Sequence, residues 1–237
     1  MSFAAAYGDE RVIAHVFTPR NVAPPFQTIV IFPGASAIVS RSSDQLAHME
    51  LVRPMVSSGR AVVYPIYKST YERGDALKSP AASTSAFYRD HVLQWSKDLG
   101  RTIDYIETRP DLDGRRIALY GVSWGAKLLP LLAAVEDRVR VGIMVNGGLG
   151  PTDSTAMPEA DPFHFAPHVR QPILMVNGRY DFVFPVESSQ QPLFELLSSP
   201  AQDKRRVVFD TAGHLLPHDL LTKEILDWLD RYLGPVR

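Results

Sequence analysis

Short apolar segments that alternate with segments of helical spacing constrain the fold of this chain more than any other feature. Residues 28–32 are almost continuously apolar, which is typical of a strand buried on both faces. We expect strands at 28–32, 60–65, 116–120, 139–145, 172–176 and 205–209, and helices at 43–57, 86–106, 126–134, 190–197 and 221–233. This alternation predicts an α/β fold with a mainly parallel central sheet and helices on both faces.

The segments outside this alternation are few. Residues 3–18 are expected to form an N-terminal antiparallel hairpin, with a turn at 7–10. Residues 67–85 are polar and turn-rich, which indicates a surface loop that could fold over a site. Residues 146–168 are rich in Gly, Pro and Asp and are expected to form an insertion near it. Without repeats or a dividing linker, we expect one domain over 1–237.

Composition excludes several classes of protein. The formal net charge of -1 over 237 residues argues against a nucleic-acid partner, which needs a basic face. The absence of cysteine removes disulfides, thiolate catalysis and cysteine-based zinc sites. The N-terminus lacks the features of a signal peptide, and the longest apolar run, 29–39, is too short to span a bilayer. We therefore expect a chain without a membrane span, in the cytoplasm.

The segment 121–125, Gly-Val-Ser-Trp-Gly, lies between an expected strand and an expected helix. A G-x-S-x-G on such a strand-to-helix turn is typical of a nucleophile elbow. Glycines on either side of the serine leave room for a tightly turned backbone. The pattern predicts that Ser123 is a nucleophile.

An acid and a histidine follow in the order that an elbow serine requires. Asp181 comes just after the expected strand 172–176, and His214 just after 205–209. A serine hydroxyl needs a base to attack a carbonyl at neutral pH, and the base needs a carboxylate to hold its tautomer. We therefore expect Ser123, Asp181 and His214 to act together.

Rival interpretations exist for the acid and the histidine. Asp210 and Asp219 are alternative acids, but Asp210 precedes the histidine loop closely and is expected to fix a turn. His214 and His218 have the spacing of metal ligands on a helix. Because Gly213 disfavours a regular helix there and no third ligand is evident, we expect no metal.

Backbone N–H groups complete the expected site. The amide of Trp124 follows the nucleophile, and the amide of Ala35 follows the flexible Gly34 at the end of the strand 28–32. Two such donors can hold a developing oxyanion. Phe182 and Phe163 are candidate substrate-binding side chains that would line an acyl pocket.

Residues 12–233 resemble a compact α/β-hydrolase of the dienelactone-hydrolase, acetyl-esterase and prolyl-oligopeptidase-like group. The resemblance is carried by the segments 32–35 (Phe-Pro-Gly-Ala), 121–125, 177–181 (Asn-Gly-Arg-Tyr-Asp) and 213–214 (Gly-His). It extends to hydrolase domains found within larger bacterial proteins. It implies an α/β-hydrolase fold without a large cap domain, and a serine carboxylesterase that acts through an acyl-enzyme. The partner would be a small ester with a short acyl chain, and no cofactor would be needed.

Two departures from the family pattern affect this interpretation. Pro33 stands where the oxyanion loop usually has a histidine, and Ser123 stands where dienelactone hydrolases have cysteine. A prolyl-oligopeptidase-like peptidase is an alternative, although such enzymes usually carry a propeller that this chain lacks. A non-catalytic interaction domain is another. A homo-oligomer formed through the apolar face of 221–233 is also left open.

Overall fold

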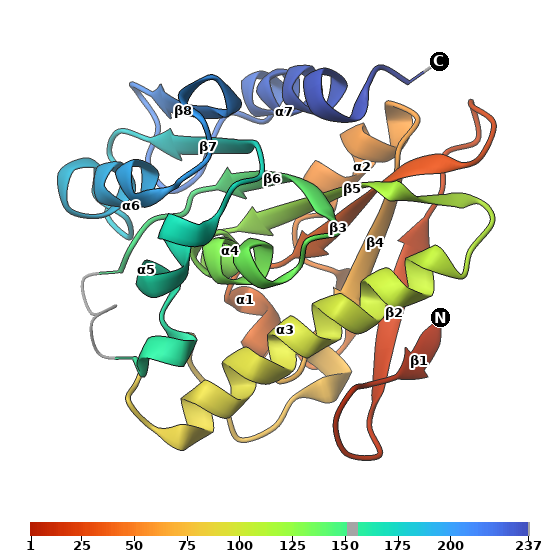
Figure 1. Ribbon diagram of the computed structural model, residues 1–237, viewed down its shortest axis with the longest axis horizontal. Helices are drawn as coiled ribbons and strands as arrows, with labels where there is room; N and C mark the ends of the chain where they lie inside the picture. The colour runs from red at the N-terminus through yellow and green to blue at the C-terminus, as the bar shows by residue number, and fades with distance from the viewer. Residues whose placement is uncertain (151–155, 237) are drawn as a thin grey trace.

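The computed structural model describes residues 1–150 and 156–236, whose strands form an eight-stranded sheet (Figure 1). The strand order is β1-β2-β4-β3-β5-β6-β7-β8. β1 and β2 form the expected N-terminal antiparallel hairpin, β2 is antiparallel to β4, and the remaining neighbours are parallel. The strands are β1 (Ser2–Ala4), β2 (Arg11–Phe17), β3 (Phe26–Phe32), β4 (Ala61–Ile66), β5 (Leu112–Val122), β6 (Val139–Val145), β7 (Ile173–Gly178) and β8 (Lys204–Phe209).

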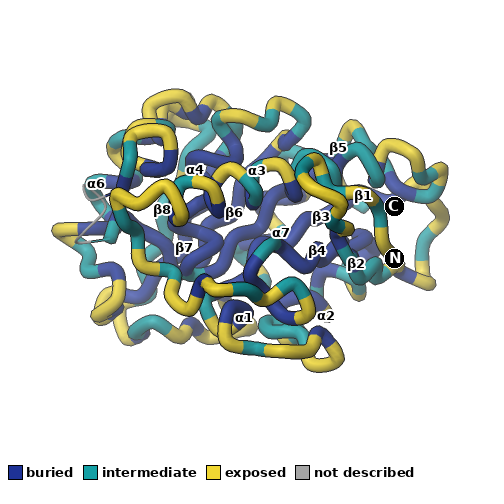
Figure 2. Tube along the Cα trace, turned by 90° about the horizontal axis from the view of Figure 1, so that it is seen from below, coloured by how far each residue is buried: buried dark blue, intermediate teal, exposed yellow. Residues whose placement is uncertain are grey.

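The central strands are apolar throughout because both faces of the sheet are covered. Along β3, Val30 and Phe32 belong to the core on one face, whereas Ile29 and Ile31 belong to the core on the other. This alternation follows from the twofold repeat of a strand. Figure 2 shows the buried strands inside a shell of more exposed loops and helices.

Helices cover the sheet in two groups. The first core contains residues of α3 (Ala86–Glu107), α4 (Trp124–Val135) and α6 (Gln191–Leu196). The second contains residues of α2 (Met49–Ser57) and α7 (His218–Leu233). In Figure 1, α3 and α4 lie in front of the sheet. Two four-residue helices, α1 (Ser36–Val39) and α5 (Pro162–Phe165), lie in the connections. The α/β-hydrolase architecture expected from the sequence is thus confirmed.

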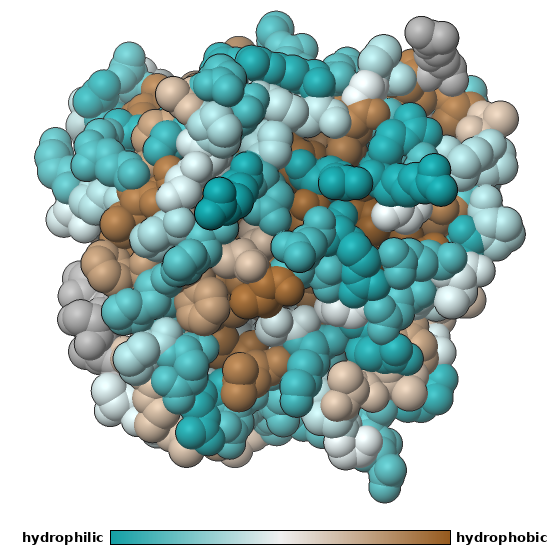
Figure 3. All heavy atoms as spheres, in the orientation of Figure 1, coloured by the Kyte–Doolittle hydropathy of each residue, from teal (hydrophilic) through white to brown (hydrophobic). Residues whose placement is uncertain are grey.

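The surface of the protein mixes hydrophobic and hydrophilic side chains. On the face shown in Figure 3, hydrophobic side chains form small areas separated by hydrophilic ones. None of the helices in the described residues combines the length and the apolarity that crossing a membrane requires.

Two expected elements differ from the structure. The expected helix 43–57 is divided into a 3-10 turn at Ser43–Gln45 and α2, which begins at Met49 after a left-handed His48. β5 begins at Leu112 rather than at 116, because a bulge moves its pairing with β3 from Asp113 to Ile117. Residues 112–115, which lie before the expected strand 116–120, are therefore part of β5.

The first part of the expected surface loop 67–85 is buried. Tyr67, Ser69 and Thr70 have no exposed surface. The reason is Asp98 on α3, which is fully buried and accepts hydrogen bonds from the Lys68 backbone N–H at 2.9 Å and from Arg73 Nη1 at 2.5 Å. Local composition cannot reveal this contact, because the acceptor lies on a different element.

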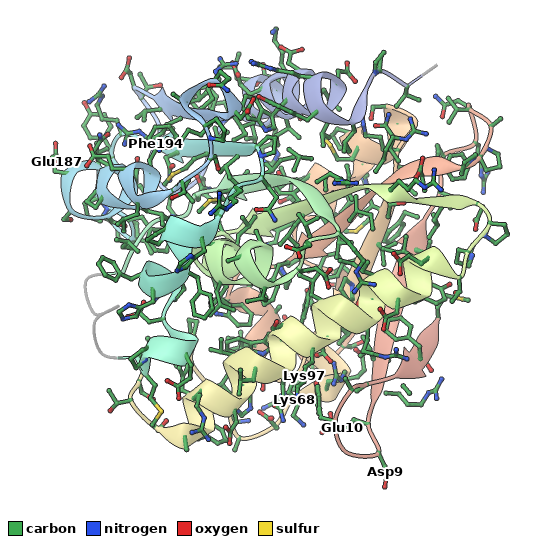
Figure 4. The ribbon with its side chains drawn as sticks, viewed as in Figure 1. Asp9, Glu10, Lys68, Lys97, Glu187 and Phe194 are labelled. Carbon is green, nitrogen blue, oxygen red and sulfur yellow. The ribbon has the colours of Figure 1, made fainter. Side chains whose placement is uncertain are left out.

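The same cluster holds the N-terminal hairpin against the body of the protein. The Tyr7 hydroxyl donates to Asp98 at 2.8 Å, and Lys68 pairs with Glu10 at 2.7 Å. Figure 4 shows Glu10 and Lys68 beside α3, with Asp9 at the outer end of the hairpin. Charged side chains from three parts of the chain thus neutralise one another around Asp98.

Candidate active site

Ser123 occupies a tight turn between β5 and α4. Its φ of 51° and ψ of -107° lie outside the usual regions for a residue with a side chain. A Cβ at Gly121 would lie 2.5 Å from the Gly125 carbonyl oxygen, and one at Gly125 would lie 2.3 Å from the Phe32 carbonyl oxygen. Only glycine fits at these two positions, so the G-x-S-x-G pattern has a steric cause.

The structure brings together the three side chains that the sequence suggested. Ser123 Oγ lies 3.0 Å from His214 Nε2, and His214 Nδ1 lies 2.9 Å from Asp181 Oδ2. The Asp181 side chain is fully buried, and its other oxygen accepts hydrogen bonds from the backbone N–H groups of Val183 and Phe184 at 2.9 and 3.0 Å. These donors fix the carboxylate so that it faces the imidazole. The catalytic roles of the three residues remain a prediction.

Backbone contacts hold the acid loop against the histidine loop. The Tyr180 N–H donates to the Ala212 carbonyl at 2.9 Å, and Asn146 Nδ2 donates to the His214 carbonyl at 2.6 Å. A Cβ at Gly178 would lie 2.1 Å from the Gly213 carbonyl oxygen. The sequence does not predict the contact between Asn146 and His214, because Asn146 is only the first residue of the expected insertion 146–168.

The loop after β3 lies beside the nucleophile. The Pro33 carbonyl accepts a hydrogen bond from the Gly125 N–H at 3.1 Å, and the Gly34 carbonyl accepts one from the Ala37 N–H at 3.2 Å. In a trans peptide the N–H points opposite to the carbonyl, so the Ala35 N–H points away from the Ala37 N–H. Ala35 and Trp124 line the same cavity as Ser123, which is compatible with the predicted pair of oxyanion donors.

The side chain of Trp124 packs in the core, away from the backbone N–H that is the expected oxyanion donor. It is buried, and its ring lies edge-on to Phe32 at 5.0 Å and to Trp95 at 4.8 Å between centroids. This packing anchors the first turn of α4 in the core. The residue after the nucleophile is therefore held firmly, as a fixed N–H donor requires.

The cavity beside Ser123 has a volume of about 250 Å³ and is mostly apolar. Its lining residues are Ala35, Ser79, Pro80, Ala81, Ala82, Ser123, Trp124, Lys127, Gly150, Val183 and Phe184. The lining does not include Phe182 or Phe163, whose side chains are 84% and 44% exposed. The two phenylalanines expected from the sequence are thus not among the residues that line the cavity. From the loop after Asp181, Val183 and Phe184 line it instead of Phe182.

Both loops that the sequence placed near a site contribute to the cavity, through 79–82 and Gly150. Residues 151–155 of the expected insertion 146–168 lie outside the described residues. The described part of that insertion continues into α5, which packs against α4.

The rival acids and ligands have other positions. Asp210 forms an exposed ion pair with Arg179 at 2.7 Å. His218 is the first residue of α7, while His214 contacts Ser123 and Asp181. Within the described residues, no three His, Cys, Asp or Glu side chains are grouped so that they could hold a metal ion.

His48 is a second polar residue near the site that the sequence did not single out. Its Nε2 lies 3.2 Å from the backbone nitrogen of Gly34. No motif connects these residues, because the contact depends on how the segment before α2 folds back over the end of β3.

Comparison with known proteins links this geometry to a family of hydrolases. The model of the dienelactone hydrolase family matches residues 12–216. The fold is similar to that of an acetyl xylan esterase from Paenibacillus sp. R4, with 16% identity, 98% of this chain and 82% of that chain covered, and a TM-score of 0.70. It is also similar to a cold-adapted esterase from an Arctic intertidal metagenomic library (17%, 100% and 93%, 0.75) and to Est1E from Butyrivibrio proteoclasticus, whose structure has ferulic acid bound (14%, 99% and 99%, 0.72).

Proposed function

Because the chain belongs to the dienelactone hydrolase family, we propose that it is a serine esterase that hydrolyses small carboxylic esters through an acyl-enzyme. The observation that carries this proposal is the connected arrangement of Ser123, His214 and Asp181, with separations of 3.0 and 2.9 Å. These distances lie within the range that proton transfer to a general base requires.

In the first half of the proposed reaction, Ser123 Oγ attacks the ester carbonyl carbon while His214 Nε2 takes the hydroxyl proton. The carbonyl π electrons move to oxygen, and the backbone N–H groups of Trp124 and Ala35 donate hydrogen bonds to this oxyanion. His214 then gives the proton to the leaving alcohol oxygen as the carbon–oxygen bond breaks. Asp181 stabilises the imidazolium that exists between these two transfers.

In the second half, water takes the place of the alcohol. His214 removes a proton from the water as its oxygen attacks the acyl carbon, and it returns that proton to Ser123 Oγ when the ester bond to the enzyme breaks. The products are a carboxylic acid and an alcohol. The protons that His214 transfers come from Ser123 and from water, and the electrons on the oxyanion return to the carbonyl when each tetrahedral intermediate breaks down.

The size and lining of the cavity favour a short acyl chain. A cavity of about 250 Å³ beside Ser123, lined largely by Ala, Pro, Val and Phe side chains, suits a small apolar group. We therefore propose acetyl to butyryl esters as the preferred substrates.

Initial rates with p-nitrophenyl acetate, butyrate and longer esters test the proposal, with Ser123→Ala as the control. We expect saturable hydrolysis of the short esters by the wild type and only background hydrolysis by the variant. Mass spectrometry of protein quenched early in the reaction should find the acyl group on the peptide that contains Ser123. Equal rates for both proteins would refute the esterase, and cleavage of aminoacyl anilides without ester cleavage would favour a peptidase.

A further inference from the structure

His48 contacts the loop that carries the proposed oxyanion donor Ala35. We propose that His48 is a positioning residue, which holds this loop in its working shape by accepting a hydrogen bond from the Gly34 N–H. The proposal rests on the function proposed above, because it concerns the same oxyanion site.

The contact determines which nitrogen of His48 carries a proton. Since Gly34 N donates to Nε2 at 3.2 Å, Nε2 must keep its lone pair and the ring hydrogen must be on Nδ1. Nδ1 lies 3.6 Å from Glu50 Oε1 on α2, which favours a hydrogen on that side. Burial lowers the pKa of His48 and so favours the neutral ring. His214 also lowers this pKa, whereas Glu50 raises it.

The backbone of His48 has a conformation that is unusual for histidine. Its φ of 64° and ψ of 26° are left-handed, a region where a Cβ is unfavourable and glycine is preferred. Its carbonyl accepts hydrogen bonds from the N–H groups of Leu51 and Val52, at 2.9 and 3.2 Å, and so starts α2. A glycine would satisfy this turn at lower cost, so the turn itself does not explain a histidine at this position.

Gly34 and His48 also fit one another sterically. A Cβ at Gly34 would lie only 2.9 Å from His48 Nε2. The imidazole therefore approaches the bare backbone of Gly34, where an added Cβ would also lie 3.7 Å from the Cβ of Ser123. Pro33 occupies the position where the family usually has a bracing histidine, and here an imidazole reaches the loop from 14 residues further along the chain.

Both polar groups of Gly34 are then fixed. Its N–H donates to His48, and its carbonyl accepts from the Ala37 N–H at 3.2 Å. The Gly34 carbonyl shares a planar peptide with the Ala35 N–H, and the Gly34 N–H belongs to the peptide before it. The two bonds therefore hold the two peptides that meet at Gly34, the second of which carries the Ala35 N–H. Without His48, the Gly34 N–H loses its acceptor, and the loop can rotate away from the geometry that binds the oxyanion. Because an oxyanion forms only in the reaction, the effect should appear mainly in kcat.

The test compares His48→Gly, which suits the left-handed backbone and removes the ring, with His48→Gln, which can offer a side-chain oxygen to the Gly34 N–H. His15→Ala is the matched control, because His15 is a half-buried histidine on β2 whose Nε2 contacts Ser43 Oγ at 2.8 Å rather than Gly34. For His48→Gly we expect kcat for p-nitrophenyl acetate to fall about tenfold, the upper range for one hydrogen bond, with little change in KM. His48→Gln should recover most of this loss, and His15→Ala should behave like the wild type.

A trifluoromethyl ketone that forms a tetrahedral adduct with Ser123 gives the decisive measurement. Its inhibition constant should rise in His48→Gly by the same factor as kcat falls, whereas the inhibition constant of 1-butanol, an alcohol without a carbonyl oxygen, should not change. An unchanged kcat, a loss that Gln does not restore, or an unchanged affinity for the ketone would each overturn the role of His48. Failure of the esterase proposal is distinguished by the wild type itself, which would then show no hydrolysis above that of Ser123→Ala.

Discussion

The tight packing of Gly125 against the end of β3 makes Gly125→Ala the most direct test of the elbow. The added Cβ would lie 2.3 Å from the Phe32 carbonyl oxygen and 2.8 Å from its carbon, whereas real Cβ contacts essentially never fall below 3.0 Å. The start of α4 must therefore move from β3 by about 0.7 Å, and both partners are backbone atoms that cannot rotate away.

The expected cost follows from this displacement. Overpacking a core costs about 1–3 kcal/mol, and we expect the upper end because the clash is with backbone. For a chain of this size, about 3 kcal/mol lowers Tm by about 6–12 °C. The same shift moves Ser123 relative to His214, and a misplacement approaching 1 Å can lower kcat about 100-fold.

Calorimetry and ester hydrolysis measure the two effects on the same protein. Gly100→Ala is the matched control, since Gly100 lies within α3 and its added Cβ would meet nothing closer than 3.5 Å. That substitution should raise stability by up to about 1 kcal/mol through helix propensity and leave activity unchanged. A Gly125→Ala protein with the Tm and kcat of the wild type would refute the steric account of the elbow.

Three further substitutions test other parts of the fold. Asp98→Asn should lower the free energy of unfolding by about 3 kcal/mol in urea titrations, because it removes the buried carboxylate that pairs with Arg73 at 2.5 Å and leaves only the more exposed Glu10 at 3.2 Å; an unchanged midpoint would contradict this. Leu119→Ala, in the centre of β5 with no exposed surface, should cost about 3 kcal/mol in the same measurement. The side-chain hydrogen bonds from Arg109 lower the pKa of Asp111 below its ordinary value of 3.8, so their stabilisation is present above the unfolded-state pKa and disappears as the pH falls through the folded-state value. The difference in Tm between the wild type and Asp111→Asn should therefore shrink as the pH falls below about 4, and a constant difference would show that the ion pair does not matter.

The parts of the site that the sequence predicted are those that depend on local rules. The sequence indicates Ser123 because the turn around it requires a glycine two residues before and two residues after the serine. Asp181 and His214 were identified because parallel strands deliver the residues after them to one edge of the sheet. Each inference needed only a strand and the residues that follow it.

The parts that escaped prediction depend on contacts between distant elements. His48 meets Gly34 only because its left-handed backbone turns the ring back toward β3. The aromatic side chain of Phe182 suggests a place in the acyl pocket, but the turn after Asp181 leaves it exposed, and Val183 and Phe184 line the cavity. Side-chain direction in a loop depends on its backbone angles, which composition does not specify.

The wide spacing of the site along the chain has a consequence for the kinetics of refolding. Ser123 follows β5, whereas His214 lies 91 residues later, after the last strand of the sheet, and contacts Asp181 after β7. Long-range pairings of this kind form late, because the loops between them must first be closed. The rings of Trp95 and Trp124 pack against each other within the first 124 residues, so they can reach their final environment before that moment. During refolding of a Trp228→Phe variant, which lacks the third tryptophan of the chain, the fluorescence of this pair should therefore return before ester hydrolysis. The delay between the two signals measures how long β7 and β8 take to join the sheet.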